Sequence, residues 1–543
     1  MTSDFLFRGD LASLDPDVAD LVRHETARQA RYLVMIPSES TIPEAVREAV
    51  GSAFHNIYAE GYPPTAMRDM NEAEILDYDQ RLAEYRRNSD KRYYKGTEYA
   101  NIVESLARRR VAEAFANEHV SAEDLYVNVQ PLSGAPANSA AYTAMLEVGD
   151  TVMGLDLLDG GHLTHGSPVN RSGIYYNIVS YGVDPETEQL DYEAIRTLAL
   201  EHQPKMIIAG FTSYPLAPDW TKFREIADEV GAYLLADIAH TAGMAAVGAY
   251  PNPVGIADVV NFTTHKTLNG PRGAVSITHD QKLAKMIDKA VFPGEQGGPH
   301  VNSIAGLAVA MKLATTQQFY DLQHQTAKNA QVLAQTLQDR GIRLAYGGTD
   351  THMLLADCKS ITGEDGAYLS GDIAARLLDL VGIVANRNTI PGDPSAFSAS
   401  GVRFGTPWIT QRGFDEAKTE RLGNIIADVF HAITPYWQPG KKKPVLRAKI
   451  DFDTFQNARN AVRELVDSVG IDTDAAADGY PHFYYMEEED ASLGWQRITV
   501  TGAEAQGFVD KAVTGTVVNL EENEQARSRL LEADGSPMAR AFV

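Results

Sequence analysis

Short apolar runs alternate with helical stretches between residues 98 and 290, and this alternation constrains the fold more than any other feature of the chain. The runs read DLYVNVQ, TVMGLD, YNIVSYG, MIIAGF, YLLADIA, VVNFTTH and AVSIT, and stretches such as VESLARRRVAEAFA separate them. This alternation predicts α/β units around a largely parallel, buried sheet. Because such sheets bind ligands at the carboxyl ends of their strands, we expect the functional site at that edge.

The rest of the chain predicts smaller units on either side of this sheet. Residues 16–49 are helical in pattern with a break at IPSEST, residues 64–91 form a charge-rich segment with helical spacing, and QPGKKKP at 438–444 is typical of a linker. We therefore predict an N-terminal helical arm (1–60), a large domain (61–312), a small α+β domain (313–437), and a linker with an accessory extension (438–543).

Composition excludes several classes of function. The chain has 543 residues with 48 basic and 73 acidic side chains, and its formal charge of −25 repels nucleic acid and anionic membranes. Cys358 is the only cysteine, so an intrachain disulfide and a cysteine zinc cluster are impossible, and we expect no metal. Without a signal-peptide pattern or a long apolar run, we expect a soluble, cytoplasmic protein.

Two apolar runs end in residues that suit catalysis with a carbonyl cofactor. Lys266 follows the run VVNFTTH, and a buried lysine there could lose its proton and form a Schiff base; taken alone, a surface lysine is the commoner interpretation. Asp237 ends the run YLLAD, where it could pair with the protonated nitrogen of a pyridine ring or simply cap the next helix. His240 follows three residues later.

Three further segments support such a site. LSGAPANSAA (132–141) opens a helix with small residues, so Ser133 and backbone amides could bind phosphate. DGGHLTHGS (159–167) places His162 after two glycines, where its ring could lie on an aromatic cofactor, although a lone histidine is more often structural. Arg403 in SGVRFGTP could bind a substrate carboxylate, or it could pair with an internal acid.

Together these motifs resemble the serine hydroxymethyltransferase family of pyridoxal 5'-phosphate (PLP) enzymes. The resemblance covers roughly residues 1–436 and includes the segments YAEGY (58–62), RYYKGTEY (92–99), GGHLTHGSPVN (160–170), DWTKFREIAD (219–228), THKTLNGPRG (264–273), FPGEQGGP (292–299) and GVRFGTP (401–407). It implies the aspartate-aminotransferase fold (fold type I), PLP bound in the large domain, tetrahydrofolate as cosubstrate, and a homodimer or tetramer with active sites between subunits.

The resemblance also implies roles for individual residues. Lys266 would hold PLP through a Schiff base, and Asp237 would pair with the nitrogen of the PLP ring. His240 would bond the phenolic oxygen of the ring, and His162 would stack on the ring face. The other cofactor contacts would be Ser133, Gly134, Thr212, Thr263 and, from the partner subunit, Gly297 and Gly298. Arg403 would bind the substrate carboxylate, with Ser38 and Tyr58 from the other subunit. Glu60 would act as acid and base near the substrate hydroxyl, beside Tyr93 and Tyr94, and Asn388 would contact folate.

The chain departs from the family pattern at several places. Residues 64–91 form an insertion between YAEGYP and RYY, and Ala135 replaces a phosphate-binding hydroxyl. The insertion keeps open a folate-independent aldolase or transaldolase acting on threonine or a related amino acid; a non-catalytic binding module is the third alternative. The tail, at 495–520 and 530–543, is similar to the start of the folate-binding aminomethyltransferase of the glycine cleavage system, or it serves oligomer contacts.

Overall fold

The computed structural model describes residues 5–89, 91–440, 443–469, 527–531 and 537–542. The chain divides into one unit made of Met1–Thr315 with Tyr320–Tyr485 and a second made of Thr316–Phe319 with Met486–Val543. Every predicted site residue belongs to the first unit. In the second unit, β15 (Arg527–Leu531) and β16 (Pro537–Phe542) form an antiparallel pair, and residues 495–520 lie outside the described part.

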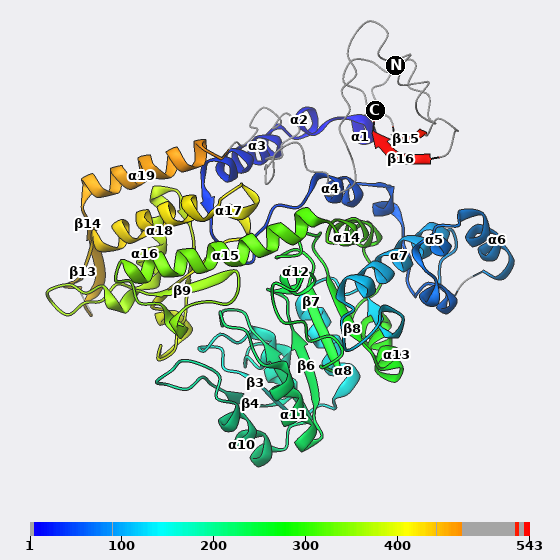
Figure 1. Ribbon diagram of the computed structural model, residues 1–543, viewed down its shortest axis with the longest axis horizontal. Helices are drawn as coiled ribbons and strands as arrows, with labels where there is room; N and C mark the ends of the chain where they lie inside the picture. The colour runs from blue at the N-terminus through cyan, green and yellow to red at the C-terminus, as the bar shows by residue number, and fades with distance from the viewer. Residues whose placement is uncertain (1–4, 90, 441–442, 470–526, 532–536, 543) are drawn as a thin grey trace, which may run out of the picture. The chain divides into compact units, whose positions relative to one another are not determined.

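A seven-stranded sheet forms the centre of the large domain, in the order β2-β8-β7-β6-β5-β3-β4 (Figure 1). Its strands are β2 (Tyr126–Asn128), β3 (Thr151–Leu155), β4 (Asn177–Tyr181), β5 (Met206–Gly210), β6 (Tyr233–Asp237), β7 (Val259–Thr263) and β8 (Ala274–Thr278). From β4 to β7 all neighbours are parallel, and β8 is antiparallel to both β7 and β2. The predicted α/β fold with a mostly parallel sheet is confirmed, and each apolar run became a strand.

Helices connect these strands and surround the sheet. They are α7 (Glu98–Phe115), α8 (Gly134–Met145), α9 (Arg171–Tyr175), α10 (Tyr192–His202), α11 (Trp220–Val230), α12 (Ala242–Ala245), α13 (Gln281–Lys289) and α14 (Val301–Leu313), with shorter turns η3 (Ala122–Asp124), η4 (Leu163–His165) and η5 (Ala290–Glu295). Apolar side chains of α8 and α13 share one core cluster with β3, β5, β6 and β7. Aspartates cap α10, α11 and α13 by accepting backbone hydrogen bonds, which explains where these helices begin.

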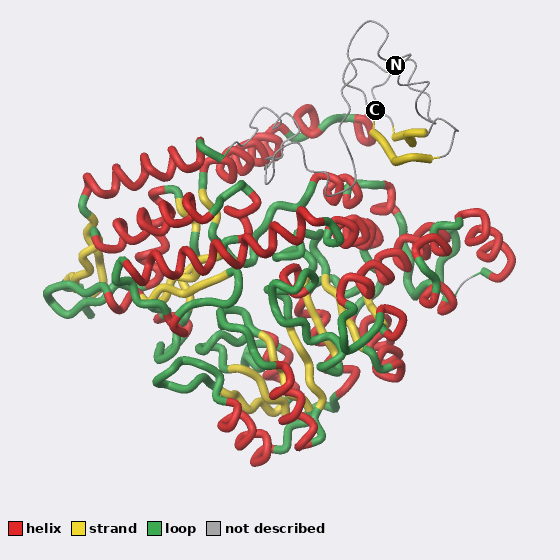
Figure 2. The backbone as a smooth tube through the Cα atoms, in the orientation of Figure 1, coloured by secondary structure: helices red, strands yellow, loops and turns green. Residues whose placement is uncertain are grey.

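The small domain is built on the antiparallel sheet β11-β12-β9. Its elements are α15 (Gln317–Asp339), η6 (Ala345–Gly347), β9 (Met353–Asp357), η7 (Cys358–Ser360), α16 (Gly371–Val381), β10 (Ile383–Val384), β11 (Asn386–Asn388), η8 (Ala396–Ser398), β12 (Gly401–Gly405), α17 (Pro407–Gln411), α18 (Glu416–His431), β13 (Ile433–Gln438), β14 (Val445–Ile450) and α19 (Phe452–Asp467). Figure 2 shows α15, α18 and α19 as long helical segments of this domain.

The residues predicted to form a linker connect two paired strands. β13 pairs with β14 out to Gln438 and Val445, so QPGKKKP spans the tip of a hairpin. After it, α19 buries Ala458, Val462 and Leu465 in the core cluster of the small domain. The four-part division remains a prediction, but residues 445–469 contribute to the small domain's core because α19 has one apolar face.

The N-terminal arm and the insertion consist of short helices. The arm contains α1 (Phe5–Arg8), α2 (Leu11–Leu14), α3 (Pro16–Arg31), β1 (Leu33–Val34), α4 (Glu44–Val50) and η1 (Ala53–Asn56), and the insertion contains η2 (Thr65–Asp69), α5 (Glu72–Ile75) and α6 (Tyr78–Asn88). β1 pairs with β10, which directs the residues after it toward the site. No helix in the described ranges is long and apolar enough to cross a membrane.

Candidate active site

The predicted cofactor residues follow neighbouring strands of the central sheet. β6 ends at Asp237, β7 ends at Thr263 just before Lys266, and Thr212 follows β5. These three strands are adjacent and parallel, so their carboxyl ends lie at one edge of the sheet, where such folds bind ligands. The strand order therefore explains why residues distant in sequence meet.

Asp237 is buried and accepts hydrogen bonds on both carboxylate oxygens. His165 Nε2 lies 3.0 Å from Oδ2, Asn138 Nδ2 donates to the same oxygen at 2.8 Å, and the Ala239 amide donates to Oδ1 at 3.0 Å. Burial alone would raise the pKa of Asp237, but the hydrogen bond from His165 lowers it well below its usual range. The carboxylate does not cap a helix, because α12 begins at Ala242 after the N-cap Thr241.

His162 lies beside this carboxylate network. Its Nδ1 is 2.7 Å from Thr164 Oγ1, which also accepts a hydrogen bond from Asn138 at 2.9 Å. Burial lowers the pKa of His162 to about 4, so the ring is neutral at physiological pH. His162, His165 and Asp237 offer three possible metal ligands within 4.8 Å, but the hydrogen bonds that Asp237 accepts make them a polar network around an ionised acid.

His240 forms a pair with a histidine of the small domain. Its Nδ1 lies 3.3 Å from Nε2 of His352, and the two rings are stacked with centroids 5.5 Å apart. Burial lowers the pKa of His240 well below its usual value and that of His352 to about 3. Both rings are therefore neutral, so one nitrogen donates and the other accepts, and the contact ties the orientation of His240 to β9.

Lys266 is a largely buried amine without a carboxylate partner. In the described ranges no acidic oxygen lies within 4.0 Å of its Nζ, and its backbone carbonyl accepts a hydrogen bond from Ser40 Oγ at 2.8 Å. Burial lowers the pKa of Lys266 to about 8, although Asp237 opposes this shift. Roughly a tenth of the amine is therefore unprotonated at pH 7, far more than for an ordinary lysine, and the neutral amine is the form that attacks a carbonyl.

Arg403 on β12 is 7% exposed and bonds only to neutral groups among the described residues. Its Nη1 donates to the Thr212 carbonyl at 2.7 Å and its Nε to Asn386 Oδ1 at 3.3 Å. Among the described residues, Arg403 therefore does not pair with an acidic side chain, which was the alternative interpretation of this arginine. Burial lowers the pKa of Arg403 to about 10, so it stays charged at neutral pH. Asn388 lies on the adjacent strand, two residues beyond the partner of Arg403.

The start of α8 presents unsatisfied backbone donors. Ser133 is the N-cap of this helix, and its side chain makes no cap hydrogen bond. A Cβ on Gly134 would lie 2.9 Å from Thr263 Cγ2, so close packing against β7 favours glycine at this position. Free amides at the beginning of a twelve-residue helix suit a phosphate.

A second group of predicted residues is more exposed than the residues at the strand ends, and its members contact one another. Tyr58 donates to Glu60 Oε1 at 3.3 Å and packs edge-on against Tyr94, with ring centroids 4.9 Å apart. The Tyr93 amide donates to the Glu60 carbonyl at 3.1 Å. A Cβ on Gly297 or Gly298 would lie about 3 Å from Glu60 and Tyr58; these six residues (Tyr58, Glu60, Tyr93, Tyr94, Gly297 and Gly298) are the tyrosine cluster.

The segment that contains Ser38 makes its contacts within its own chain. The amide of Gly405 donates to the Met35 carbonyl at 2.7 Å, and Ser40 contacts the loop of Lys266 in the same chain. Because β1 pairs with β10, the segment that follows β1 is held between the small domain and the loop of Lys266. The role of Ser38 at the substrate carboxylate stays a prediction.

Three residues of the site were missed by reasoning from the sequence alone: Asn138, His165 and His352. His165 follows His162 by three residues without a motif of its own, and Asn138 lies on the helix after the phosphate turn without a distinctive motif. The only signal was the spacing of the two histidines in GGHLTHG. His352 could not be found because its contact with His240 joins segments far apart in the chain.

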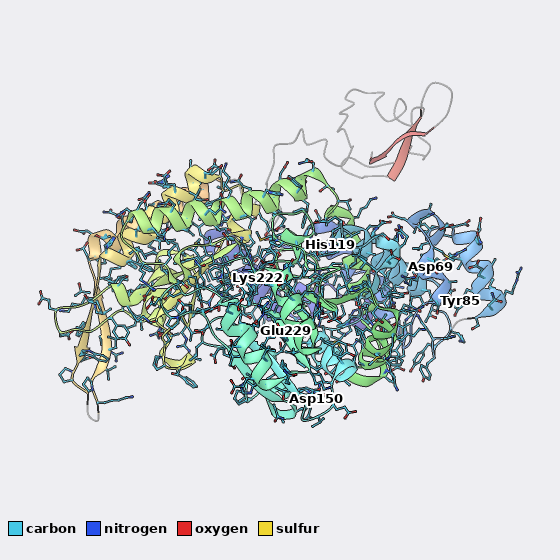
Figure 3. The ribbon with its side chains drawn as sticks, turned by 60° about the horizontal axis from the view of Figure 1, so that its bottom comes forward. Asp69, Tyr85, His119, Asp150, Lys222 and Glu229 are labelled. Carbon is cyan, nitrogen blue, oxygen red and sulfur yellow. The ribbon has the colours of Figure 1, made fainter. Side chains whose placement is uncertain are left out.

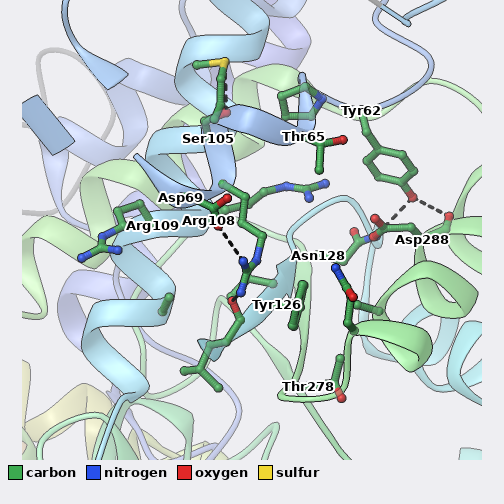
Figure 4. Close-up of a pocket in the computed structure, with 18 of the residues that line it drawn as sticks. Tyr62, Thr65, Asp69, Ser105, Arg108, Arg109, Tyr126, Asn128, Thr278 and Asp288 are labelled. Carbon is green, nitrogen blue, oxygen red and sulfur yellow. Dashed lines mark hydrogen bonds and ion pairs between the residues drawn. The ribbon is translucent and has the colours of Figure 1, made fainter. Parts of the chain in front are cut away.

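A separate hollow with a volume of about 270 Å³ lies between the insertion, α7, β2 and α13 (Figure 4). Tyr62 Oη donates to the Asp288 carbonyl at 2.6 Å, and Asn128 Nδ2 donates to Asp288 Oδ1 at 2.7 Å. Burial raises the pKa of Asp288. Its lining includes none of the predicted cofactor residues, so this hollow is distinct from the site at the strand ends.

The residues at the strand ends fit PLP by their donor set. The buried amine of Lys266 suits the aldehyde of PLP, and the ionised carboxylate of Asp237 suits its ring nitrogen. The neutral imidazole of His162 suits the face of the ring, and the amides at the start of α8 suit the phosphate. With the α/β sheet and the small domain, they define a PLP-dependent enzyme of fold type I.

Comparison with known proteins narrows this class. The family model for serine hydroxymethyltransferase matches residues 11–90 and 87–426, two segments that meet at the end of the insertion. A serine hydroxymethyltransferase from Synechococcus sp. (strain JA-3-3Ab) is 48% identical over 79% of this chain and 92% of its own length; one from Nitrosospira multiformis is 46% identical over 78% and 92%. The chain belongs to the serine hydroxymethyltransferase family, whose members are PLP-dependent transferases.

Proposed function

We propose that this protein interconverts serine and glycine and transfers the hydroxymethyl carbon to tetrahydrofolate. The observation that supports this most directly is the convergence of Lys266, the Asp237–His165 pair and the buried, acid-free Arg403 at one edge of the sheet. These groups would serve an amine, a pyridine nitrogen and an amino-acid carboxylate. The relatives that carry the name serine hydroxymethyltransferase agree with this assignment.

Several residues would hold PLP. Lys266 would bind its aldehyde, Asp237 its ring nitrogen, His162 its ring face and His240 its phenolic oxygen. Ser133, Gly134 and Thr263 would lie at the phosphate end, with Thr212 nearby and Gly297 and Gly298 of a partner subunit completing it. When bound, PLP supplies an electron sink that stabilises negative charge on the α-carbon of an amino acid.

The protein's own side chains would orient the substrate and move its protons. Arg403 would bind the substrate carboxylate with two parallel hydrogen bonds, assisted by Ser38 of the same chain. The Lys266 amine, with its lowered pKa, can accept or return a proton at the α-carbon. Glu60 would transfer the proton of the serine hydroxyl, and Asn388 would contact folate.

The tyrosine cluster supports a homodimer. Tyr58, Tyr93 and Tyr94 are 54%, 76% and 44% exposed, and their polar and ring contacts lie within the cluster and the adjoining loop. A partner subunit would cover these aromatic side chains and receive Glu60 and Tyr94 beside its own Arg403. Each active site would then be completed by the second subunit.

The aldolase alternative is not favoured. The insertion suggests it, yet Tyr58 donates to Glu60 and packs against Tyr94, and the Tyr93 amide donates to the Glu60 carbonyl, so the insertion does not displace these residues. The relatives that align with most of the chain carry the name serine hydroxymethyltransferase and support the folate-dependent reaction instead.

The deciding experiment measures glycine formation from serine by the PLP-loaded protein, with and without tetrahydrofolate. We expect turnover to depend on folate and to disappear in Lys266→Ala. Borohydride reduction followed by peptide mapping should find PLP attached to Lys266. Cleavage of threonine at a rate indifferent to folate, with no folate-dependent use of serine, would refute the proposal.

A further inference from the structure

The insertion is packed firmly onto α7. Met67 and Ile75 share an apolar cluster with Ile102 of α7, and Ile75 is fully buried. Glu72 forms an ion pair with Arg110 of α7 at 2.6 Å, and Arg68 donates to the Glu123 carbonyl at 2.7 Å next to the edge strand β2. The insertion is therefore a fixed part of the domain and can hold its neighbours in place.

One side chain of the insertion reaches the loop that carries the predicted substrate tyrosines. Tyr85 lies on α6, and Figure 3 labels it on this outlying part of the chain. Its hydroxyl accepts a hydrogen bond from the Gly96 amide at 2.8 Å and a longer one from the Thr97 amide at 3.4 Å. Thr97 is the N-cap of α7, and its hydroxyl donates to the Tyr94 carbonyl at 3.2 Å. Tyr85 therefore binds the two amides that lie between this loop and the first turn of α7.

The other end of this loop is held by a buried arginine. Arg92 is 2% exposed, and its Nη1 donates to the carbonyls of Ala59 and Gly61 at 2.6 and 2.9 Å, on either side of Glu60. Its Nη2 is paired with Glu104 of α7 at 2.7 Å. Residues 93–95 thus span two anchors, Arg92 on one side and the amides bound by Tyr85 on the other.

We propose that Tyr85 is a positioning residue for the reaction and that the insertion serves to fix the loop of Tyr93 and Tyr94. Gly96 has a φ of +78°, and among the described residues no atom lies within 4 Å of a Cβ built on it. The Tyr85 hydroxyl therefore holds the backbone at a position where a side chain of the loop would find no neighbour to pack against. Through the ring contact of Tyr94 with Tyr58, the anchor would set the geometry around Glu60. This inference rests on the proposed function.

The test compares Tyr85→Phe with Tyr78→Phe in the full-length, PLP-loaded protein. Both tyrosines lie on α6, but Tyr78 is 53% exposed and its hydroxyl makes no hydrogen bond to the described residues. We expect Tyr85→Phe to speed amide exchange at Gly96 and Thr97 and to raise the KM for serine about fivefold, the effect of losing one neutral hydrogen bond. PLP affinity should stay unchanged, and Tyr78→Phe should match the wild type.

Two outcomes would overturn this inference. The first is unchanged amide exchange at Gly96 and Thr97 in Tyr85→Phe. The second is a rise in KM that occurs equally in Tyr78→Phe or is accompanied by weaker PLP binding, because either result indicates general destabilisation. If the wild-type protein does not use serine and folate, the proposed function is wrong. The amide-exchange measurement still tests whether Tyr85 holds the loop, because it does not depend on activity.

Discussion

Replacing Arg403 by methionine should weaken serine binding while changing the stability of the cofactor-free protein little. The fall in the pKa of Arg403 from 12.5 to about 10 corresponds to about 3 kcal/mol of lost hydration. Because the donor is charged, the hydrogen bonds to the Thr212 carbonyl and Asn386 return about 1.5 kcal/mol each. These contributions nearly cancel, so a methionine of similar length should change the unfolding free energy by less than about 1 kcal/mol.

The same change removes the charged partner of the substrate. Two charge-assisted hydrogen bonds to a carboxylate contribute about 3 kcal/mol or more, so the KM for serine should rise on the order of a hundredfold. Steady-state kinetics measure the first effect and thermal unfolding of the cofactor-free protein the second. Arg387→Met is the matched control, because Arg387 lies on adjacent β11, is half exposed and pairs with Asp372 at 3.3 Å. Serine binding within about threefold of wild type, or a loss of more than about 2 kcal/mol in the unfolding free energy, would refute the reasoning.

Other predictions concern the amine, its carboxylate partner and the insertion. The rate at which the cofactor-free protein captures PLP should rise with pH and level off above about pH 8, because the reactive neutral form of Lys266 increases through its pKa; a flat profile from pH 6.5 to 9 contradicts this. His165→Ala removes the hydrogen bond that lowers the pKa of Asp237, so PLP affinity, followed by absorbance, should fall about tenfold or more, most at acid pH where the carboxylate gains a proton; an unchanged affinity argues against the pair. Ile75→Ala should cost about 2–4 kcal/mol in unfolding free energy if the insertion is packed as described, and denaturant unfolding would reveal a smaller effect.

Local patterns were enough to predict the sheet. Short runs of mainly apolar residues, such as MIIAG and VVNFT, favour strands whose two faces are both covered. These two segments form the fully buried strands β5 and β7. The helical insertion was also predictable, because residues 64–91 are too charged for a strand. By contrast, QPGKKKP reads locally as a linker, and only the pairing of β13 with β14 shows that it turns a hairpin.

Motif positions likewise determined which residues could carry the chemistry: an amine and an acid at the ends of apolar runs, a histidine after glycines and an arginine between them. Only the tertiary structure decided which side chain or backbone group each of these residues contacts. The histidine beside Asp237, the second histidine beside His240, the neutral partners of Arg403 and the Tyr85 anchor all join residues through folded contacts. A hydrogen bond depends on distance and direction in space, and for long-range pairs neither follows from separation along the chain.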